Sequence, residues 1–133
     1  MRLNRVMIYV KDIDRMAVFY GKILGLKPVN ETQMENWVEF EAGEGSIRFA
    51  LHAIPLETAD QIEISSPPML RETNALKFSF EVDDIASECQ RLKLLGVRIV
   101  QRPWGAYDGV DPEGNIFGFI QQPNVAPAHN VVT

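Results

Sequence analysis

The chain repeats itself once along its length of 133 residues, and this repeat limits the fold more than any other feature. A Val-x-Asp-Ile motif recurs after 72 residues, as Val10, Asp12 and Ile13 against Val82, Asp84 and Ile85. A Gly followed by an apolar residue recurs too, as Gly25-Leu26 against Gly96-Val97. Two copies of one supersecondary unit are therefore expected in a single domain, since a chain of this length suffices for one core.

Each copy is predicted to begin with a strand that leads into a capped helix. Residues 5–10 and 76–82 alternate apolar and polar side chains, as half-buried strands do. Asp12 and Asp84 are suited to cap the helices that follow. Apolar residues at helical spacing predict helices over 13–24 and 85–95.

Three further strands are expected after each helix. They are predicted at 27–32, 36–42 and 46–52 in the first copy, and at 97–102, 104–110 and 116–121 in the second. The turn sequences EAGEGS and DPEGN precede the last strand of each copy. The predicted order is βαβββ, twice, which is an α+β fold class.

We expect one domain over 1–133, with a first unit at 1–53, a linker at 54–74, a second unit at 75–122 and a loosely held tail at 123–133. The linker is long for a connection inside a domain, so it could be a spacer or a lid. Pro67-Pro68 stiffens it, and the sequence IEIS at 62–65 is a candidate edge strand.

Charge and composition exclude several kinds of partner. The formal net charge is −5, and the sequence contains no basic run, so nucleic acid and anionic membrane are not expected partners. No apolar run is long enough to cross a bilayer and no export signal is visible, so we expect a cytoplasmic protein. Cys89 is the only cysteine, which excludes an internal disulfide and a thiolate metal cluster.

The two units, the opening VKDIDRMAVFYGKILGLKPV and the ending DPEGNIFGFIQ together resemble the vicinal oxygen chelate superfamily. That superfamily includes glyoxalase I, bleomycin-resistance proteins and extradiol dioxygenases, and the resemblance covers 1–122. It implies tandem βαβββ units that form a cupped mixed sheet with helices outside and a ligand cavity inside. It also implies a homodimer.

The resemblance further implies four metal-ligand positions, on the first and last strand of each unit. Arg5 and Lys77 stand at the first-strand positions, and Arg48 (or Phe49, after a slip of one residue) and Gly118 stand at the last-strand positions. An Arg side chain offers no lone pair and a Lys side chain only when neutral, so we predict no metal and no cofactor. His52 and His129 are the only histidines, too few for a two-His site in the folded core.

The same cations are the predicted ligand-binding groups. Their expected partners are Glu81 for Lys77, and Glu39 and Glu41 for the arginines. Either this is an internal ion network that replaces the metal, or one donor remains free to recognise a carboxylate, phosphate or enolate. Aromatic walls are expected from nearby rings, Trp104 among the candidates. The predicted ligand-binding set is Arg5, Tyr9, Trp37, Arg48, Lys77, Glu81 and Tyr107.

Two other clusters are weaker candidates. Asp108 and Asp111 supply too few oxygen ligands for Ca²⁺, and Asp111 is expected to open a β-turn. His52 could form an acid-base pair with Glu57 or Glu63 if the linker folds over the cavity. No catalytic residue is assigned.

Three functions remain open at this point. The chain could be a metal-independent protein that binds a small anionic or aromatic molecule. It could instead be a lyase, isomerase or dioxygenase of the vicinal oxygen chelate type, with or without a divalent metal. The third alternative is a partner-binding module with a collapsed cavity. Binding is favoured because no general base with a clear partner is present.

Overall fold

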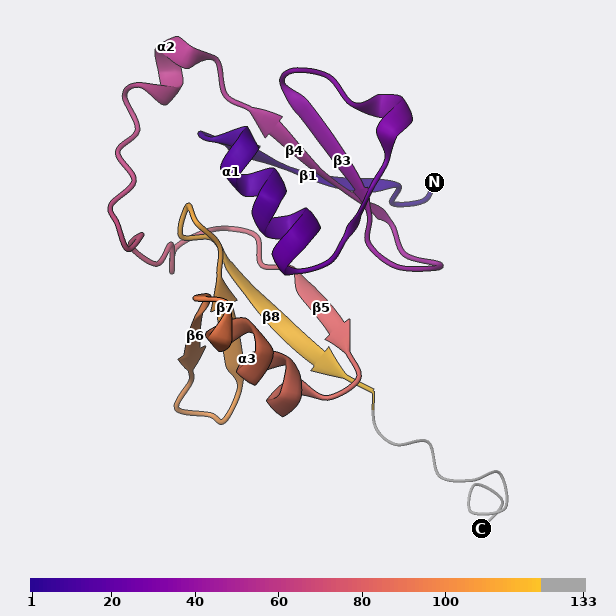
Figure 1. Ribbon diagram of the computed structural model, residues 1–133, viewed down its shortest axis with the longest axis vertical. Helices are drawn as coiled ribbons and strands as arrows, with labels where there is room; N and C mark the ends of the chain where they lie inside the picture. Colours follow the sequence, from indigo (N-terminus) through magenta and orange to yellow (C-terminus); the bar gives the residue numbers. More distant parts are fainter. Residues whose placement is uncertain (123–133) are drawn as a thin grey trace. The chain divides into compact units, whose positions relative to one another are not determined.

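The computed structural model of the chain describes residues 1–122 and divides into two compact units. Unit 1 contains Met1–Arg71 together with Asp111–Asn115, and unit 2 contains Glu72–Val110 together with the chain from Ile116 onward. Both units have the predicted βαβββ order, so the predicted α+β fold class is confirmed (Figure 1).

Unit 1 contains one four-stranded mixed sheet in the order β1-β4-β3-β2. Its strands are β1 (Arg5–Val10), β2 (Lys27–Pro28), β3 (Trp37–Glu41) and β4 (Arg48–Ala53), with β1 and β4 parallel and the other pairs antiparallel. Its helical segments are α1 (Ile13–Val18), the π-helix η1 (Phe19–Ile23), the 3₁₀-helix η2 (Asn30–Thr32) and α2 (Leu56–Ala59).

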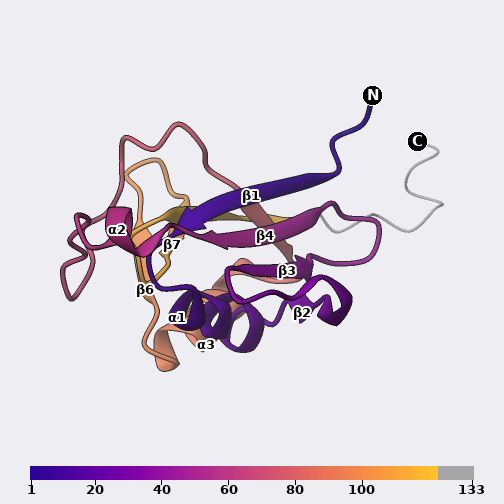
Figure 2. The same ribbon diagram turned by 90° about the horizontal axis from the view of Figure 1, so that it is seen from above.

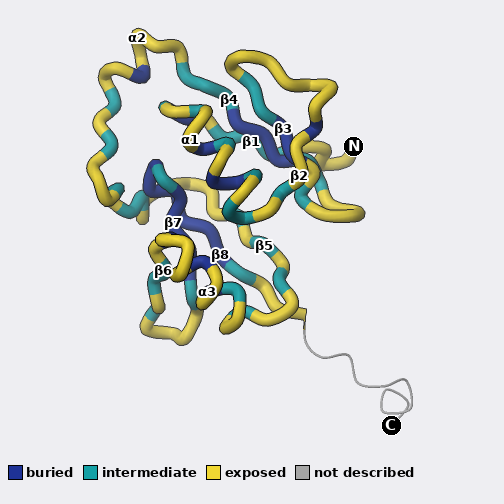
Figure 3. The backbone as a smooth tube through the Cα atoms, in the orientation of Figure 1, coloured by how far each residue is buried: buried dark blue, intermediate teal, exposed yellow. Residues whose placement is uncertain are grey.

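Helix α1 covers one face of this sheet and forms the core of unit 1 with it. In Figure 2, α1 and β2 lie to one side of β1 and β4. The buried side chains of the helical stretch are Met16, Phe19 and Tyr20, and those of the sheet include Phe40, Phe49 and Leu51 (Figure 3). The alternate residues of each strand point to the opposite face.

The start of α1 is held by a distant segment of unit 1, Asp111–Asn115. Asp12 caps the helix as predicted, accepting a hydrogen bond from the Arg15 amide at 3.1 Å. The buried Glu113 carboxylate accepts the Lys11 and Asp12 amides at 2.8 to 2.9 Å. The N-terminus of α1 is therefore already neutralised by a carboxylate from within its own unit.

Asp111 is the second buried carboxylate of this segment, and it opens a β-turn as predicted. It accepts hydrogen bonds from the Tyr20 hydroxyl at 2.7 Å and from Nδ2 of Asn115 at 2.8 Å, as well as from the backbone amides of Glu113 and Asn115. Burial raises the pKa of Asp111 above its ordinary value, and the hydrogen bond from Tyr20 opposes that rise. Burial, and then the charge of Asp111, raises the pKa of Tyr20 well above its ordinary value.

Unit 2 repeats the architecture with the sheet order β5-β8-β7-β6. Its elements are β5 (Ser79–Val82), α3 (Ile85–Leu94), β6 (Arg98–Gln101), β7 (Tyr107–Val110) and β8 (Ile116–Gln121). Asp84 caps α3 as predicted, accepting a hydrogen bond from the Ser87 amide at 3.2 Å.

Several predicted boundaries are wrong for local reasons. The strand expected at 27–32 ends after Pro28, and a 3₁₀ turn follows. The helix expected over 13–24 changes to a π-helix at Phe19. The sequence IEIS forms no strand, and the short helix α2 was not predicted in the linker. His129 and the tail expected at 123–133 lie outside the described residues.

A membrane-spanning helix would need a long apolar stretch. Among residues 1–122, none of the helices has the length and apolar character required to cross a bilayer.

Candidate functional site

Strand register places a charged row of side chains across all four strands of unit 1. Arg5 of β1 lies opposite Arg48 of β4, Arg48 lies opposite Glu41 of β3, and Glu41 lies opposite Lys27 of β2. Residues directly opposite each other in neighbouring strands share one face of the sheet. This row therefore carries three cations and one carboxylate on the face of the sheet opposite to the one that α1 covers.

Two residues further along the strands, Glu39 is the buried centre of the same face. Met7, Ala50 and Glu39 lie opposite one another there. Nη1 of Arg5 lies 3.3 Å from one carboxylate oxygen of Glu39, and Nη1 of Arg48 lies 3.3 Å from the other. The indole N–H of Trp37 donates to the first oxygen at 3.2 Å. The predicted pairing of the arginines with Glu39 is therefore confirmed.

A further two residues along, the face presents an aromatic row. Tyr9, His52 and Trp37 lie opposite one another on β1, β4 and β3. The rings of Tyr9 and His52 stack at 5.4 Å, and the ring of Trp37 meets that of His52 edge-on at 5.6 Å. Tyr9 is 61% exposed, so this row offers ring surface to a ligand.

Arg5 links the charged and aromatic rows. Its Cζ atom lies 4.8 Å from the centre of the Trp37 ring, a cation-π contact. Within the described chain, Arg5 and Arg48 each bond Glu39 through Nη1 alone, and their side chains are 44% and 39% exposed. Two guanidinium groups thus share one carboxylate, which leaves a net positive charge and unused donors beside the aromatic rings.

The charged residues of unit 2 are arranged differently. The Lys77 ammonium lies 2.8 Å from Asp108, and Nε of Arg102 lies 2.8 Å from the other oxygen of the same carboxylate. Arg102 also bonds Glu72 at 2.8 Å. These hydrogen bonds, to Glu72 and then to Asp108, raise the pKa of Arg102. Lys77 and Arg102 are therefore balanced one to one by Asp108 and Glu72.

Two predicted ion pairs are wrong. Lys77 pairs with Asp108 and not with Glu81. Glu81 lies four residues further along the chain, within β5. Asp108 lies on the neighbouring part of the sheet, directly opposite Gly118. Glu41 pairs with its cross-strand neighbour Lys27 at 4.0 Å and not with an arginine.

The metal-ligand positions implied by the resemblance do not fit a metal ion. Arg5 and Arg48 face each other across β1 and β4, and Lys77 is held by Asp108. Gly118 lies opposite Ser79, two residues beyond Lys77, so it corresponds to Ala50 of unit 1 rather than to Arg48. Guanidinium groups cannot donate an electron pair to a cation. Residues 1–122 also contain no group of three or more His, Cys, Asp or Glu side chains that could hold a metal ion.

Tyr107 and Trp104 belong to unit 2. Tyr107 is half-buried at the start of β7, and Trp104 is exposed, with the Arg102 guanidinium 6.0 Å from its ring. The predicted ligand set thus divides between the units: Arg5, Tyr9, Trp37 and Arg48 lie on one face of unit 1, and Lys77, Glu81 and Tyr107 lie in unit 2. Their role in ligand binding remains a prediction.

Sequence reasoning missed Lys27, Asp108 and Arg102 as members of these clusters. One signal was available for Asp108, because it stands three residues before the turn at Asp111, on the strand predicted immediately before the last strand. His52 was considered only as an acid-base group, whereas the structure places it between two aromatic rings.

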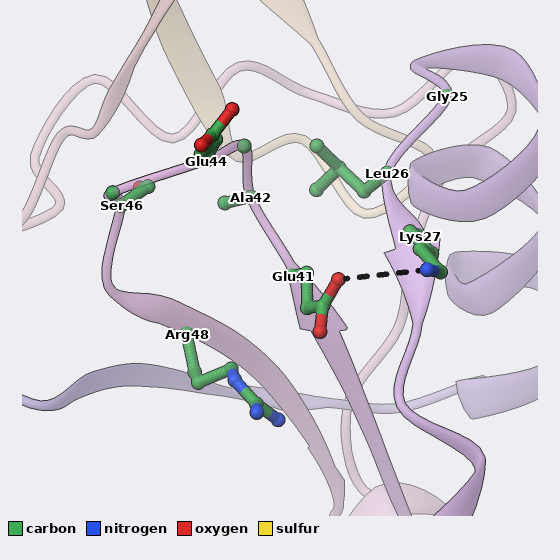
Figure 4. Close-up of a pocket in the computed structure, with 10 residues that line it drawn as sticks. Gly25, Leu26, Lys27, Glu41, Ala42, Glu44, Ser46 and Arg48 are labelled. Atoms are coloured by element: carbon green, nitrogen blue, oxygen red, sulfur yellow. Dashed lines mark ion pairs between the residues drawn. The ribbon is translucent and has the colours of Figure 1, made fainter.

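A pocket of about 640 Å³ opens at the charged end of the unit 1 face. Figure 4 shows its lining residues. They come from the stretch after η1, from β3 and β4, and from the loop between those strands: Gly25, Leu26, Lys27, Glu41, Ala42, Gly43, Glu44, Gly45, Ser46 and Arg48. Of the predicted ligand-binding residues, Arg48 alone lines it.

Comparison with known proteins agrees with this architecture. The family model for the Glyoxalase/Bleomycin resistance protein/Dioxygenase superfamily matches residues 2–119. The chain therefore belongs to that superfamily, as its resemblance to vicinal oxygen chelate proteins indicated. No curated protein matches the sequence.

Solved structures share the fold at low sequence identity. TnmS3, an antibiotic binding protein from Streptomyces sp. CB03234, is 21% identical with a TM-score of 0.61, covering 92% of this chain and 97% of its own. The bleomycin resistance determinant encoded on transposon Tn5 is 19% identical with a TM-score of 0.59, covering 92% and 98%. A glyoxalase/dioxygenase from Nostoc punctiforme is 16% identical with a TM-score of 0.69, covering 92% of each chain.

Proposed function

We propose that this protein binds a small aromatic molecule with an anionic group, without a metal ion, on the face of the unit 1 sheet. The observation that carries the proposal is the position of Arg5, whose guanidinium contacts the Trp37 ring while it bonds Glu39 through one nitrogen only. An aromatic surface and a charged donor are thus adjacent, as a ligand with a ring and a carboxylate requires.

The ion network alone is a weaker account of this face. A network that only neutralised the Glu39 carboxylate would need one cation, whereas Arg5 and Arg48 both approach it and both remain about 40% exposed. Exposed cations of this kind add little to stability, so their presence beside Tyr9, His52 and Trp37 favours recognition. The likeness in fold to an antibiotic binding protein and to a bleomycin resistance determinant supports a binding role for this chain.

Isothermal titration with naphthalene-2-carboxylate and its neutral amide tests the proposal. We expect the acid to bind at least about tenfold more tightly than the amide, because only the acid gains charge-assisted bonds to the guanidinium groups. The Arg5→Met variant should lose most of this preference. The matched variant Arg98→Met, which removes an exposed arginine from β6, should retain it.

Equal affinity for acid and amide in the native protein would refute anion recognition. An equal loss of preference in both variants would show that the effect is one of overall charge. Because Arg48 and Trp37 still bond Glu39 when Arg5 is replaced, the variant is expected to fold, and its unfolding free energy provides the check.

We also propose that the protein forms a homodimer. Strand β1 ends the sheet order of unit 1, and Leu3 just before it is exposed. An edge strand with exposed apolar side chains is commonly covered by association. Sedimentation equilibrium at micromolar concentration should give the mass of two chains, and the mass of one chain would refute the dimer.

A further inference from the structure

The pocket beyond the charged row lies on the same sheet as the proposed aromatic site. Lys27, Glu41 and Arg48 line it, and the same three residues make up the charged row together with Arg5. Arg48 belongs to both places, since it lines the pocket and donates to Glu39. The aromatic row, the guanidinium groups and the pocket are therefore successive parts of one surface.

Strand geometry gives the span of this surface. The aromatic and charged rows are four residues apart on β1 and on β4. At about 3.3 Å per residue, the two rows are separated by roughly 13 Å. A single aromatic acid such as naphthoate reaches the Arg5 guanidinium, which lies 4.8 Å from the centre of the Trp37 ring, but it is too short to reach the pocket as well. A ring with a polar tail can reach both.

The charges of the pocket indicate which tail it accepts. The Lys27 ammonium is 4.0 Å from Glu41, and both side chains are largely exposed, so this pair is weak and the ammonium remains available. Glu44, the other carboxylate of the lining, lies on the loop between β3 and β4, apart from Lys27 (Figure 4). The strands therefore contribute two cations to the pocket, Lys27 and Arg48, and one carboxylate, Glu41.

The size of the pocket agrees with a ligand tail. Its volume of about 640 Å³ falls within the range usual for small-molecule sites. Its lining mixes polar and apolar surface: charged side chains, the backbone of a loop that contains Gly43 and Gly45, and Leu26 as its one large apolar side chain. A hydrated chain that ends in an anion suits this lining better than a second aromatic ring.

We infer that the ligand has two parts: an aromatic head on the Tyr9, His52 and Trp37 row, and a hydrophilic tail in this pocket that ends in an anionic group at Lys27. The inference rests on the proposed function, because the head occupies the site described there. It adds a second subsite, and with it a class of ligand: an aromatic ring joined through a polyhydroxylated or similar polar chain to a phosphate or carboxylate.

Riboflavin and riboflavin 5′-phosphate are suitable probes, because they share a ring and a ribityl chain and differ in the terminal phosphate. Stacking on Trp37 or Tyr9 should quench flavin fluorescence, so quenching measures binding of the aromatic head directly. We expect the phosphate to bind at least about tenfold more tightly than riboflavin, from charge-assisted bonds at Lys27.

Two lysine variants test the tail subsite. Lys27→Met should reduce the ratio of the two affinities to near one while riboflavin affinity is unchanged. Lys22→Met removes an exposed lysine of η1 that does not line the pocket, and it should keep the ratio of the native protein.

Equal affinities in the native protein, tighter binding of riboflavin, or a ratio that survives Lys27→Met would each overturn the two-part ligand. Absence of quenching by both flavins would overturn it as well. The naphthoate titration decides the proposed function separately, because naphthoate has no tail that could reach Lys27.

Discussion

The two units place a buried carboxylate at the same position and surround it differently. Glu39 lies on β3 and Asp108 on β7, each beside the last strand of its unit, and each accepts two cations. In unit 1 both cations are about 40% exposed and share Glu39. In unit 2 Lys77 is 48% exposed, but the Arg102 side chain is only 13% exposed and is bonded to Glu72 as well. The cluster in unit 2 is thus closed, with two carboxylates for two cations, whereas in unit 1 two cations share one carboxylate.

The neighbours of the two carboxylates extend this difference. In unit 1 the next row along the strands consists of Tyr9, His52 and Trp37. In unit 2 the corresponding positions on the parallel pair are Glu81 and Ile120. One architecture thus carries an aromatic and cationic face in the first copy and a balanced ion cluster in the second. The repeat specifies the fold, and the side chains at a few matched positions specify the site.

The largest expected effect comes from neutralising the two carboxylates. Asp108→Asn should lower the free energy of unfolding by about 2–4 kcal/mol, because it removes the buried one of the two carboxylates that bond the nearly buried Arg102 guanidinium. Glu39→Gln should cost only about 1–2 kcal/mol, since water reaches both arginines. Urea denaturation of the two variants measures the difference. A larger loss for Glu39→Gln would contradict the view that unit 2 holds the closed cluster.

A smaller effect is expected from Tyr20, which bonds the buried Asp111 carboxylate of unit 1. Tyr20→Phe should cost about 1–2 kcal/mol near neutral pH. The pKa of Asp111 is raised in the folded state, so the native protein binds the proton more tightly than the unfolded chain does. The contribution of Asp111 to stability therefore falls as the pH rises above the ordinary pKa of an aspartate. Tyr20 limits that rise in pKa, so its removal should cost more at pH 7 than at pH 3.

The measurement is the unfolding free energy of the native protein and of Tyr20→Phe across that pH range. A loss that is equal at both pH values would mean that Tyr20 contributes packing and no bond to the ionised carboxylate. Val110→Ala, a change in the same stretch that touches no charge, is the control and should give a loss independent of pH.

The smallest effect concerns the centre of unit 2, where Gly118 takes the place of Ala50. A Cβ atom at Gly118 would lie 2.6 Å from Oγ of Ser79 and 3.4 Å from Cε of Lys77. Gly118→Ala should therefore cost about 1 kcal/mol, because the Ser79 side chain must move away from the new atom. Adding Ser79→Ala should recover most of the loss in a thermal melt, and failure to recover it would show that Lys77 or the backbone resists the new atom.

The sequence alone predicted the repeat, the capping residues and nearly every strand, because alternation, Asp caps and Gly stops are local signals. The pairing of Arg5 and Arg48 with Glu39 also followed, since alternation places them on one face. The pairing of Lys77 with Asp108 did not, because it depends on which residues of β5, β7 and β8 lie opposite one another. The Glu113 contact with the start of α1 joins residues about a hundred positions apart, so no local sequence pattern predicts it.

The central claim is that the ligand occupies the face of unit 1, and the two tryptophans allow a direct test. Trp37 lies on that face, and Trp104 lies in unit 2. In a ¹⁵N-labelled protein each indole N–H gives one signal, which Trp104→Phe assigns. Titration with naphthalene-2-carboxylate should shift the Trp37 signal in proportion to occupancy, through the ring current of the ligand and the bond to Glu39, while the Trp104 signal remains in place. A shift of the Trp104 signal with an unchanged Trp37 signal, or no shift of either at concentrations that saturate binding, would contradict the account.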